Sequence, residues 1–191
     1  MKDKIYNLII WASASVLLVL ADQYTKVLAV IHLKGKEAYV ILDGVFELLY
    51  SENRGAAFGM MQGKQGLFFL IGISVLIVAA IAMYRLPGWK QHRYHWLKIC
   101  VILITAGAIG NMVDRVLQGY VVDFLYFSLI NFPIFNVADI YVTVATGLLM
   151  ILMFFFYSDE DLECLYPDSR KRMKKNPSSD KTHTSGKEEV F

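Results

Sequence analysis

The sequence predicts an all-α membrane protein, a bundle of four transmembrane helices with a small extracytoplasmic β-sheet element. Two observations indicate this fold class. The chain of 191 residues is 56% hydrophobic, and its mean hydropathy of +0.45 exceeds that of typical soluble proteins. Its charges are also unevenly distributed, because residues 158–191 hold 8 of the 17 acidic residues. Residues 1–157 therefore carry few charges and have the composition of a membrane domain.

Four segments of this domain are long and apolar enough to cross about 30 Å of hydrocarbon, which takes about 20 helical residues. The first segment continues past Ala12-Ser13-Ala14, a pattern that resembles a signal-peptide cleavage site. Because the apolar run does not stop there, we interpret it as a permanent anchor. The four expected spans cover approximately residues 5–21, 67–84, 97–117 and 137–157.

The connection of residues 31–66 is expected to form β-structure. Two runs rich in β-branched, aromatic and aliphatic residues, EAYVIL and VFELLY, flank the dipeptide Asp43-Gly44. This pattern is typical of a hairpin with a two-residue type I′ turn. The charged tail of residues 158–191 is the opposite case: it cannot bury a core, so we expect it to be disordered.

The positions of Lys and Arg predict the orientation in the membrane. Basic residues precede the first span, crowd the acid-free connection between the second and third spans, and follow the fourth. These three regions fall on one side of a four-span chain, so both termini should be cytoplasmic and residues 31–66 should lie outside. The residues concerned are Lys2, Lys4, Arg85, Lys90, Arg93, Lys98 and the run 170–175.

Four acidic residues lie in or beside the expected spans, and this topology puts all four at the outer face. They are Asp22, Asp114, Asp123 and Asp139. Charged groups in membrane spans are costly and usually face the bundle interior or a wet cavity. Four carboxyl groups at one depth therefore predict a functional site.

The segment GNMVDR in the third span presents one polar helix face. Gly107, Gly110, Asn111 and Asp114 are spaced at i, i+3, i+4 and i+7, so they share a side of the helix. Small residues there let another helix approach closely, while Asn and Asp form interhelical hydrogen bonds. A purely structural clamp explains the pattern as well as a functional site does. Arg115 follows, in a position to pair with an acid or a backbone carbonyl.

Two further motifs carry polar residues near the outer face. In DQYTK, Asp22 and Lys26 are four residues apart and predict a helix ion pair, which a solvated position at the span end would also explain. In NRGAAFG, Asn53, Gly55 and Gly59 indicate a tight turn or a close backbone approach.

The segment from Asp123 to Asp139 contains no other charge. Asn136 is a good N-cap for the fourth span, and Asp139 is then the third helical residue, where the helix dipole favours an acid. Capping does not explain Asp123, which sits among apolar neighbours. Two carboxylates at a dry boundary repel each other and share one proton, which is the arrangement that aspartic proteases use.

Five motifs in order, DQYTK, NRGAAF, GNMVDR, VVDF and FNVAD, resemble those of the lipoprotein signal peptidases (signal peptidase II) of bacterial cytoplasmic (inner) membranes. The resemblance implies an aspartic endopeptidase that removes signal peptides from diacylglyceryl-modified prolipoproteins by cleaving before the lipidated cysteine. It implies that Asp123 and Asp139 are the catalytic pair.

The same resemblance implies roles for other residues and partners. It implies no metal and no organic cofactor. We also expect membrane lipid as a partner, and four spans can form a complete site within a monomer. No basic stripe suggests binding of nucleic acid. The residues that match supporting or substrate-binding positions are Asn53, Gly55, Asn111, Asp114, Arg115, Asn136, Asp22 and Lys26.

Two other functions remain to be distinguished. A small proton- or ion-coupled transporter would also carry intramembrane carboxylates, but it predicts acids spread across the membrane depth and broken helices near the midplane. A non-enzymatic assembly protein would use the polar residues only to lock its helices together. It predicts that replacement of Asp123 or Asp139 costs stability, whereas a peptidase would stay folded and lose activity.

Overall fold

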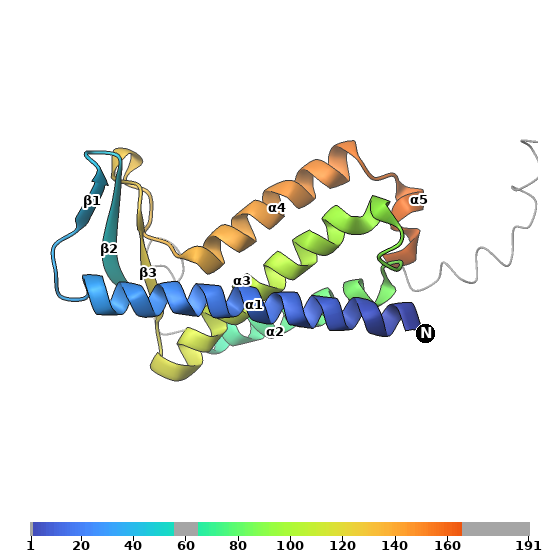
Figure 1. Ribbon diagram of the computed structural model, residues 1–191, viewed down its shortest axis with the longest axis horizontal. Helices are drawn as coiled ribbons and strands as arrows, with labels where there is room; N and C mark the ends of the chain where they lie inside the picture. Colours follow the sequence, from blue (N-terminus) through green and yellow to red (C-terminus); the bar gives the residue numbers. More distant parts are fainter. Residues whose placement is uncertain (1, 56–64, 166–191) are drawn as a thin grey trace, which may run out of the picture.

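The computed structural model describes residues 2–55 and 65–165. Four of its helices are long and apolar enough to cross a membrane, and they are accompanied by a three-stranded sheet, so the predicted fold class is confirmed (Figure 1). The helices are α1 (Lys2–Leu33), α2 (Gln65–Arg85), α3 (His95–Gln118) and α4 (Val137–Phe155). The strands are β1 (Tyr39–Leu42), β2 (Phe46–Asn53) and β3 (Val121–Tyr126).

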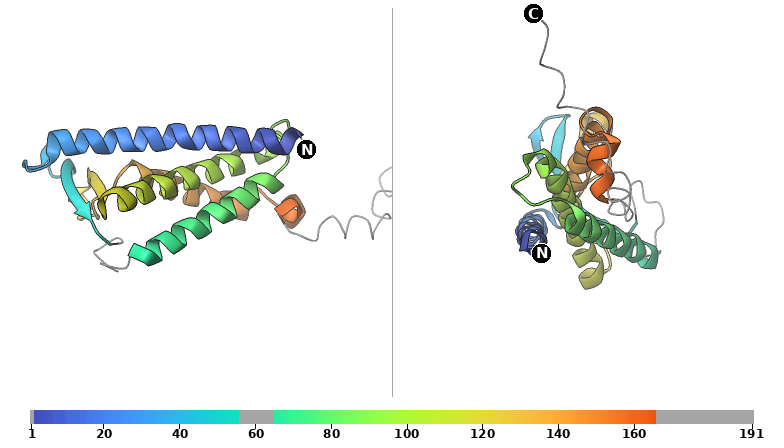
Figure 2. Two further views of the ribbon diagram at one scale, coloured as in Figure 1. Left: turned by 90° about the horizontal axis from the view of Figure 1, so that it is seen from below. Right: turned by 90° about the vertical axis from the view of Figure 1, so that its right-hand side faces the viewer.

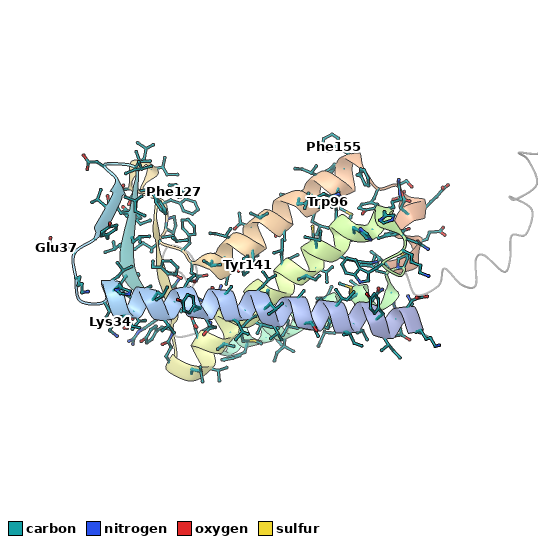
Figure 3. The ribbon with its side chains drawn as sticks, in the orientation of Figure 1. Lys34, Glu37, Trp96, Phe127, Tyr141 and Phe155 are labelled. Carbon is teal, nitrogen blue, oxygen red and sulfur yellow. The ribbon has the colours of Figure 1, made fainter. Side chains whose placement is uncertain are left out.

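Helix α3 lies at the centre of the bundle and contacts each of the other three spans. The α3 face that carries Gly107, Gly110, Asn111 and Asp114 is turned inward. Apolar side chains such as Phe155 of α4 project outward from the bundle (Figure 3). The glycines predicted to allow close approach do so. A Cβ atom on Gly107 would lie 2.5 Å from the carbonyl oxygen of Ala138 in α4, and one on Gly110 would lie 2.6 Å from Asp22 in α1.

Helix α1 is longer than the sequence predicted. The expected span ended at Ala21, but the helix continues to Leu33 and runs from the N-terminal end of the molecule to the sheet (Figures 1 and 2). Asp22 and Lys26, whose charges suggested the end of the span, are buried at 0% and 3% exposure and so do not interrupt it. At about 1.5 Å per residue, the helix exceeds the thickness of the hydrocarbon layer and carries the sheet on its last turns.

The sheet has the order β1-β2-β3 with antiparallel pairing throughout. The predicted hairpin is present, but the predicted type I′ turn is wrong. Leu42 pairs with Phe46, which leaves a loop of residues 43–45, and only Gly44 has positive φ (+64°). A type I′ turn requires positive φ at both central residues. The third strand, β3, was not predicted.

The two faces of β3 have different neighbours, because side chains alternate along a strand. Val122 and Phe124 pack against Ala29 and Leu33 of α1 and form an apolar cluster. Asp123, between them in the chain, is directed to the other face. The strand therefore attaches the sheet to α1 and presents one carboxyl group on the opposite side.

The end of the bundle away from the sheet is closed by polar contacts. Asn7 of α1 donates hydrogen bonds to the carbonyls of Leu86 and Pro87 after α2. After α4, short helices α5 (Asp159–Leu162) and η4 (Glu163–Leu165) pack at the same end, and Asp161 forms a salt bridge of 2.5 Å with Arg93. The first residues of the expected disordered tail are thus helical, whereas residues 166–191 lie outside the described part of the chain.

Candidate active site

Asp123 and Asp139 come from different elements and meet through one asparagine. Asp123 lies on β3, and Asp139 lies in the first turn of α4. The Asn136 side chain donates to Asp123 Oδ1 (2.6 Å) and accepts from the backbone N–H of Asp139 (3.0 Å). The Asn136 backbone N–H donates in turn to Asp139 Oδ2 (3.2 Å), which completes a capping box. The predicted cap is confirmed, and it also links the two carboxyl groups.

Two more asparagines donate to the pair. Asn53 Nδ2 lies 2.9 Å from Asp123 Oδ2, and Asn111 Nδ2 lies 2.7 Å from Asp139 Oδ1. Asn53 is brought there by strand pairing, because β2 pairs with β3 so that Ser51 lies opposite Asp123. Each of the four carboxyl oxygens therefore accepts at least one hydrogen bond, and the amides hold both groups in a fixed orientation.

A buried ion cluster is in contact with one of these asparagines. Lys26 Nζ is 2.9 Å from Asp22 Oδ2, 3.0 Å from Asp114 Oδ2 and 3.1 Å from Asn111 Oδ1. The ion pair predicted between Asp22 and Lys26 is confirmed, but its interpretation as a solvated pair is wrong. Gln23 Nε2 donates to Asp114 Oδ1 (2.9 Å), a contact that the charge spacing within DQYTK does not predict.

The ion cluster also fixes the segments that carry the aspartates. Asp22 Oδ1 accepts the backbone N–H of Ala138, which precedes Asp139 (2.9 Å). Asp114 Oδ2 accepts the backbone N–H of Val122, which precedes Asp123 (3.2 Å). Each acid of the cluster thus anchors the residue next to one member of the pair.

Arg115 binds backbone carbonyls, one of the two options that its position suggested. Its guanidinium donates to Asn111 O (3.2 Å) and Gly55 O (3.4 Å), and it lies 4.6 Å from the ring centroid of Phe68 on α2. Gly55 is buried, and its N–H donates to Asn53 Oδ1 (3.0 Å), so these contacts hold the chain beside Asn53. Gly59 of the same motif lies outside the described residues. The sequence did not identify Phe68 as a neighbour of Arg115, because its segment is apolar throughout and no single residue in it stands out.

Two pockets meet beside Asp139. The larger, of about 640 Å³, lies between the segment following β3 and helix α4, and Phe127 lines it from the sheet side (Figure 3). The smaller, of about 320 Å³, lies between α2, α3 and α4. Both pockets have mostly apolar walls. The residues that line both are Phe68, Arg115, Asp139 and Thr143.

The environment of Asp123 favours its protonated form. Burial raises the pKa of this carboxyl to about 7, and the nearby charge of Asp139 acts in the same direction. The hydrogen bonds from Asn53 and Asn136 and the charge of Lys26 oppose this rise in pKa without cancelling it. A carboxyl group with such a pKa holds a proton near neutral pH, as one member of a proton-sharing pair must.

Within residues 2–55 and 65–165, no three His, Cys, Asp or Glu residues are grouped as metal ligands. The two pockets offer a bound molecule the Asp139 carboxyl, the amides of Asn53 and Asn111, and apolar walls. Four apolar helices with two buried carboxyl groups, one on β3 and one in α4, are the arrangement expected of a membrane aspartic peptidase.

Comparison with known proteins identifies the family. A family model described as signal peptidase (SPase) II matches residues 14–155. The chain belongs to the signal peptidase II family, which confirms the resemblance noted in the sequence and makes the protein a peptidase. Family membership supports the removal of signal peptides from prolipoproteins as the activity, and it gives no support to the transporter alternative.

Three relatives named lipoprotein signal peptidase illustrate the similarity. That of Geobacillus kaustophilus is 41% identical over 152 residues, which cover 78% of this chain and 95% of the relative. That of Caldanaerobacter subterraneus is 44% identical over 138 residues (72% and 90%), and that of Brevibacillus brevis is 41% identical over 133 residues (70% and 87%). With such bacterial relatives and four apolar helices, the chain is a bacterial multi-pass membrane protein.

Two solved structures share the fold, and both are described as bacterial membrane enzymes. One has a TM-score of 0.67 at 27% identity and covers 93% of this chain and 94% of its own. The other has a TM-score of 0.65 at 31% identity and covers 78% and 94%, respectively.

Proposed function

We propose that Asp123 and Asp139 are the catalytic pair of an endopeptidase that removes signal peptides from diacylglyceryl-modified prolipoproteins, cleaving before the lipidated cysteine. The observation that carries this proposal is the arrangement of the two carboxyls. Asn53, Asn111 and Asn136 donate to them, and Asp139 lies at the junction of two apolar pockets.

The chemistry follows from the proton that the pair shares. One carboxylate accepts a proton from a water molecule, whose oxygen bonds to the scissile carbonyl carbon. The other carboxyl donates a hydrogen bond to the carbonyl oxygen as negative charge develops there. The C–N bond then breaks as the leaving nitrogen is protonated. The two roles belong to the pair, because strongly coupled groups titrate together.

The apolar pockets suit a substrate that carries acyl chains and an apolar helix. A prolipoprotein presents an apolar signal helix and acyl chains, and both can remain in apolar surroundings while the peptide bond reaches the carboxyls. The smaller pocket opens between three spans, and the larger is walled by aromatic and aliphatic residues from Phe127 to Phe135. Membrane lipid is the natural occupant of these surfaces between reaction cycles.

The membrane orientation is also part of the proposal. The sheet and the aspartate pair occupy the extracytoplasmic face, and both termini are cytoplasmic. Support comes from basic residues at the start of α1, at the end of α2 and just before α3, since these ends of the helices lie opposite the sheet. They are Lys4, Arg85 and Arg93. Residues 1–157 form the peptidase unit, and a monomer suffices for activity, because this chain supplies both carboxyls and the three asparagines that donate to them.

The test combines cleavage and stability. Wild-type protein, Asp123→Asn and Asp139→Asn are purified in detergent and offered a diacylglyceryl-modified prolipoprotein or its unmodified counterpart. Release of the signal peptide is followed by gel shift, and thermal unfolding is recorded in parallel. We expect cleavage of the lipidated substrate by the wild type and a loss of at least about 10²-fold in both variants, which should remain folded.

Asp159→Asn is the matched control, because Asp159 is an exposed carboxyl at the opposite end of the molecule. It should cleave as the wild type does. Continued cleavage by Asp123→Asn and Asp139→Asn would show that the pair is wrongly assigned. A wild type that cleaves nothing, with variants that merely unfold earlier, would favour the purely structural role.

A further inference from the structure

Lys26 is buried, and each of its three N–H donors has a partner. An ammonium group has three N–H donors and no acceptor. At Lys26 these donors meet Asp22 Oδ2, Asp114 Oδ2 and the amide oxygen of Asn111, all within 3.1 Å. The residue is 3% exposed, so water does not replace these partners. Two acidic partners suffice to neutralise the charge of a lysine. The third contact, to the neutral Asn111 amide, is therefore not needed for neutralisation.

The contact to Asn111 determines which way its amide points. The oxygen and the NH₂ group of an asparagine have nearly the same shape, so their neighbours decide the orientation. Here Oδ1 faces Lys26, and Nδ2 faces Asp139 Oδ1 at 2.7 Å. In the reversed orientation, NH₂ would face an ammonium group and the oxygen would face a carboxylate, so both contacts would be repulsive.

The same oxygen connects Lys26 to the other aspartate. Asn111 Oδ1 also accepts from Asn136 Nδ2 (3.1 Å), which donates to Asp123 Oδ1 (2.6 Å). Lys26, Asn111 and Asp139 thus form one chain of hydrogen bonds, in which the cation polarises the Asn111 amide and strengthens its bond to Asp139. Asn136 joins this chain by donating to the same Asn111 oxygen, so the position of that oxygen also bears on the contact between Asn136 and Asp123.

We propose that Lys26 is a positioning residue for catalysis, which fixes the direction of the amide hydrogen bonds that hold Asp123 and Asp139. The inference rests on the proposed function. Lys26 is buried and its three donors are occupied by Asp22, Asp114 and Asn111, so it has no contact with the peptide in that proposal. It acts on the reaction through Asn111.

The other charged groups around the pair do not orient the Asn111 amide. Arg115 lines the same pockets as Asp139, and its hydrogen bonds go to the carbonyls of Asn111 and Gly55. The acids Asp22 and Asp114 accept from Lys26, so they hold it in position. The charged groups facing the site are, by element, Asp22 and Lys26 of α1, Asp114 and Arg115 of α3, Asp123 of β3 and Asp139 of α4.

The experiment compares Lys26→Met with Lys26→Arg in the full chain, with kcat and KM measured from pH 4.5 to 9 on the lipidated prolipoprotein. For Lys26→Met we expect kcat to fall by about 10- to 100-fold with KM within about twofold, because the pockets are intact. The pH–rate profile should move to higher pH by about one unit, because the pair loses a nearby positive charge that favours its ionised form. Lys26→Arg keeps a charged group with donors only, so its profile should stay in place.

Lys34→Met is the matched control, since Lys34 is half-exposed and pairs with Glu52 on the surface. It should keep the wild-type pH profile. A Lys26→Met protein with wild-type kcat and pH profile, per folded molecule, would overturn the inference and leave Lys26 a structural residue.

If Lys26→Met does not fold, Lys26→Gln replaces it. A profile displaced in Lys26→Gln but not in Lys26→Arg supports the inference, and identical profiles overturn it. The proposed function fails separately, through an inactive wild type or an active Asp123→Asn.

Discussion

The protonation state of Asp123 affects the stability of the folded protein. Its pKa is about 7 in the folded protein, because burial and the charge of Asp139 disfavour the carboxylate. In an unfolded chain an aspartate has a pKa near 3.9. The folded state therefore binds this proton more tightly. Its stabilising effect is fully present below about pH 4 and is lost as pH rises through about 7.

The pH dependence of unfolding should reveal this linkage. The difference in pKa corresponds to at most about 4 kcal/mol, so the wild-type Tm should fall by roughly 5 °C or more between pH 5 and pH 8. Asp123→Asn removes the titrating group, and its Tm should fall less over the same range. Differential scanning fluorimetry in detergent measures both slopes, with Asp159→Asn as the control that keeps the wild-type slope. Equal slopes in wild type and Asp123→Asn would contradict the burial of an ionisable Asp123.

Residue-level predictions from the sequence succeeded where partners are close in the chain. The capping of α4 by Asn136 and the pair of Asp22 with Lys26 follow from spacings of three and four residues, which a helix converts into contacts. The contact of Asn53 with Asp123 spans 70 residues and depends on the register of β2 against β3. No local pattern encodes that register, so the sequence named both residues without predicting that they touch.

At the level of elements, α3 organises the site. One face of this helix supplies Asn111 and Asp114 to the polar network, and Gly107 and Gly110 let α4 and α1 approach closely enough to complete it. The spacing within α3 was sufficient to predict this face. Strand β3 was missed because its residues VVDFLY form a short apolar run next to a span, and only its pairing with β2 distinguishes it from a span end.

Substitution of Gly107 tests the close approach of α3 and α4. In Gly107→Ala, the new Cβ would meet the Ala138 carbonyl and Val142 Cγ2 at 2.5 Å, so the helix backbones must separate. We expect a loss of about 1–3 kcal/mol in unfolding free energy and a loss of cleavage, because Ala138 precedes Asp139. Gly147→Ala in α4 is the control: its Cβ meets nothing within 4 Å, and the stability should be unchanged or rise by up to about 1 kcal/mol. Thermal unfolding and the gel-shift assay report both effects, and equal stability of the two variants would contradict the packing.

At the level of the whole molecule, the two ends differ in chemistry. The sheet, with exposed apolar residues on β1, and the carboxyl pair lie at one end, and the Arg93–Asp161 salt bridge lies at the other with α5 (Figure 2). Because α1 runs the full length between them, the site's height above the membrane centre is set by one continuous helix. An orientation with the sheet outside then places the pair where a translocated prolipoprotein leaves the hydrocarbon.

Cysteine labelling decides this orientation. Cys100 and Cys164 are free thiols, so they are first replaced by Ala and Ser, and cleavage by that background protein is checked. Single cysteines are then introduced by Asp43→Cys at the hairpin turn and by Gln91→Cys between α2 and α3, both exposed positions. In sealed spheroplasts, a membrane-impermeant maleimide should label Asp43→Cys and should reach Gln91→Cys only after permeabilisation. The reverse pattern would put the carboxyl pair in the cytoplasm, where a peptidase of exported prolipoproteins has no substrate, and the proposed function would then be lost together with the orientation.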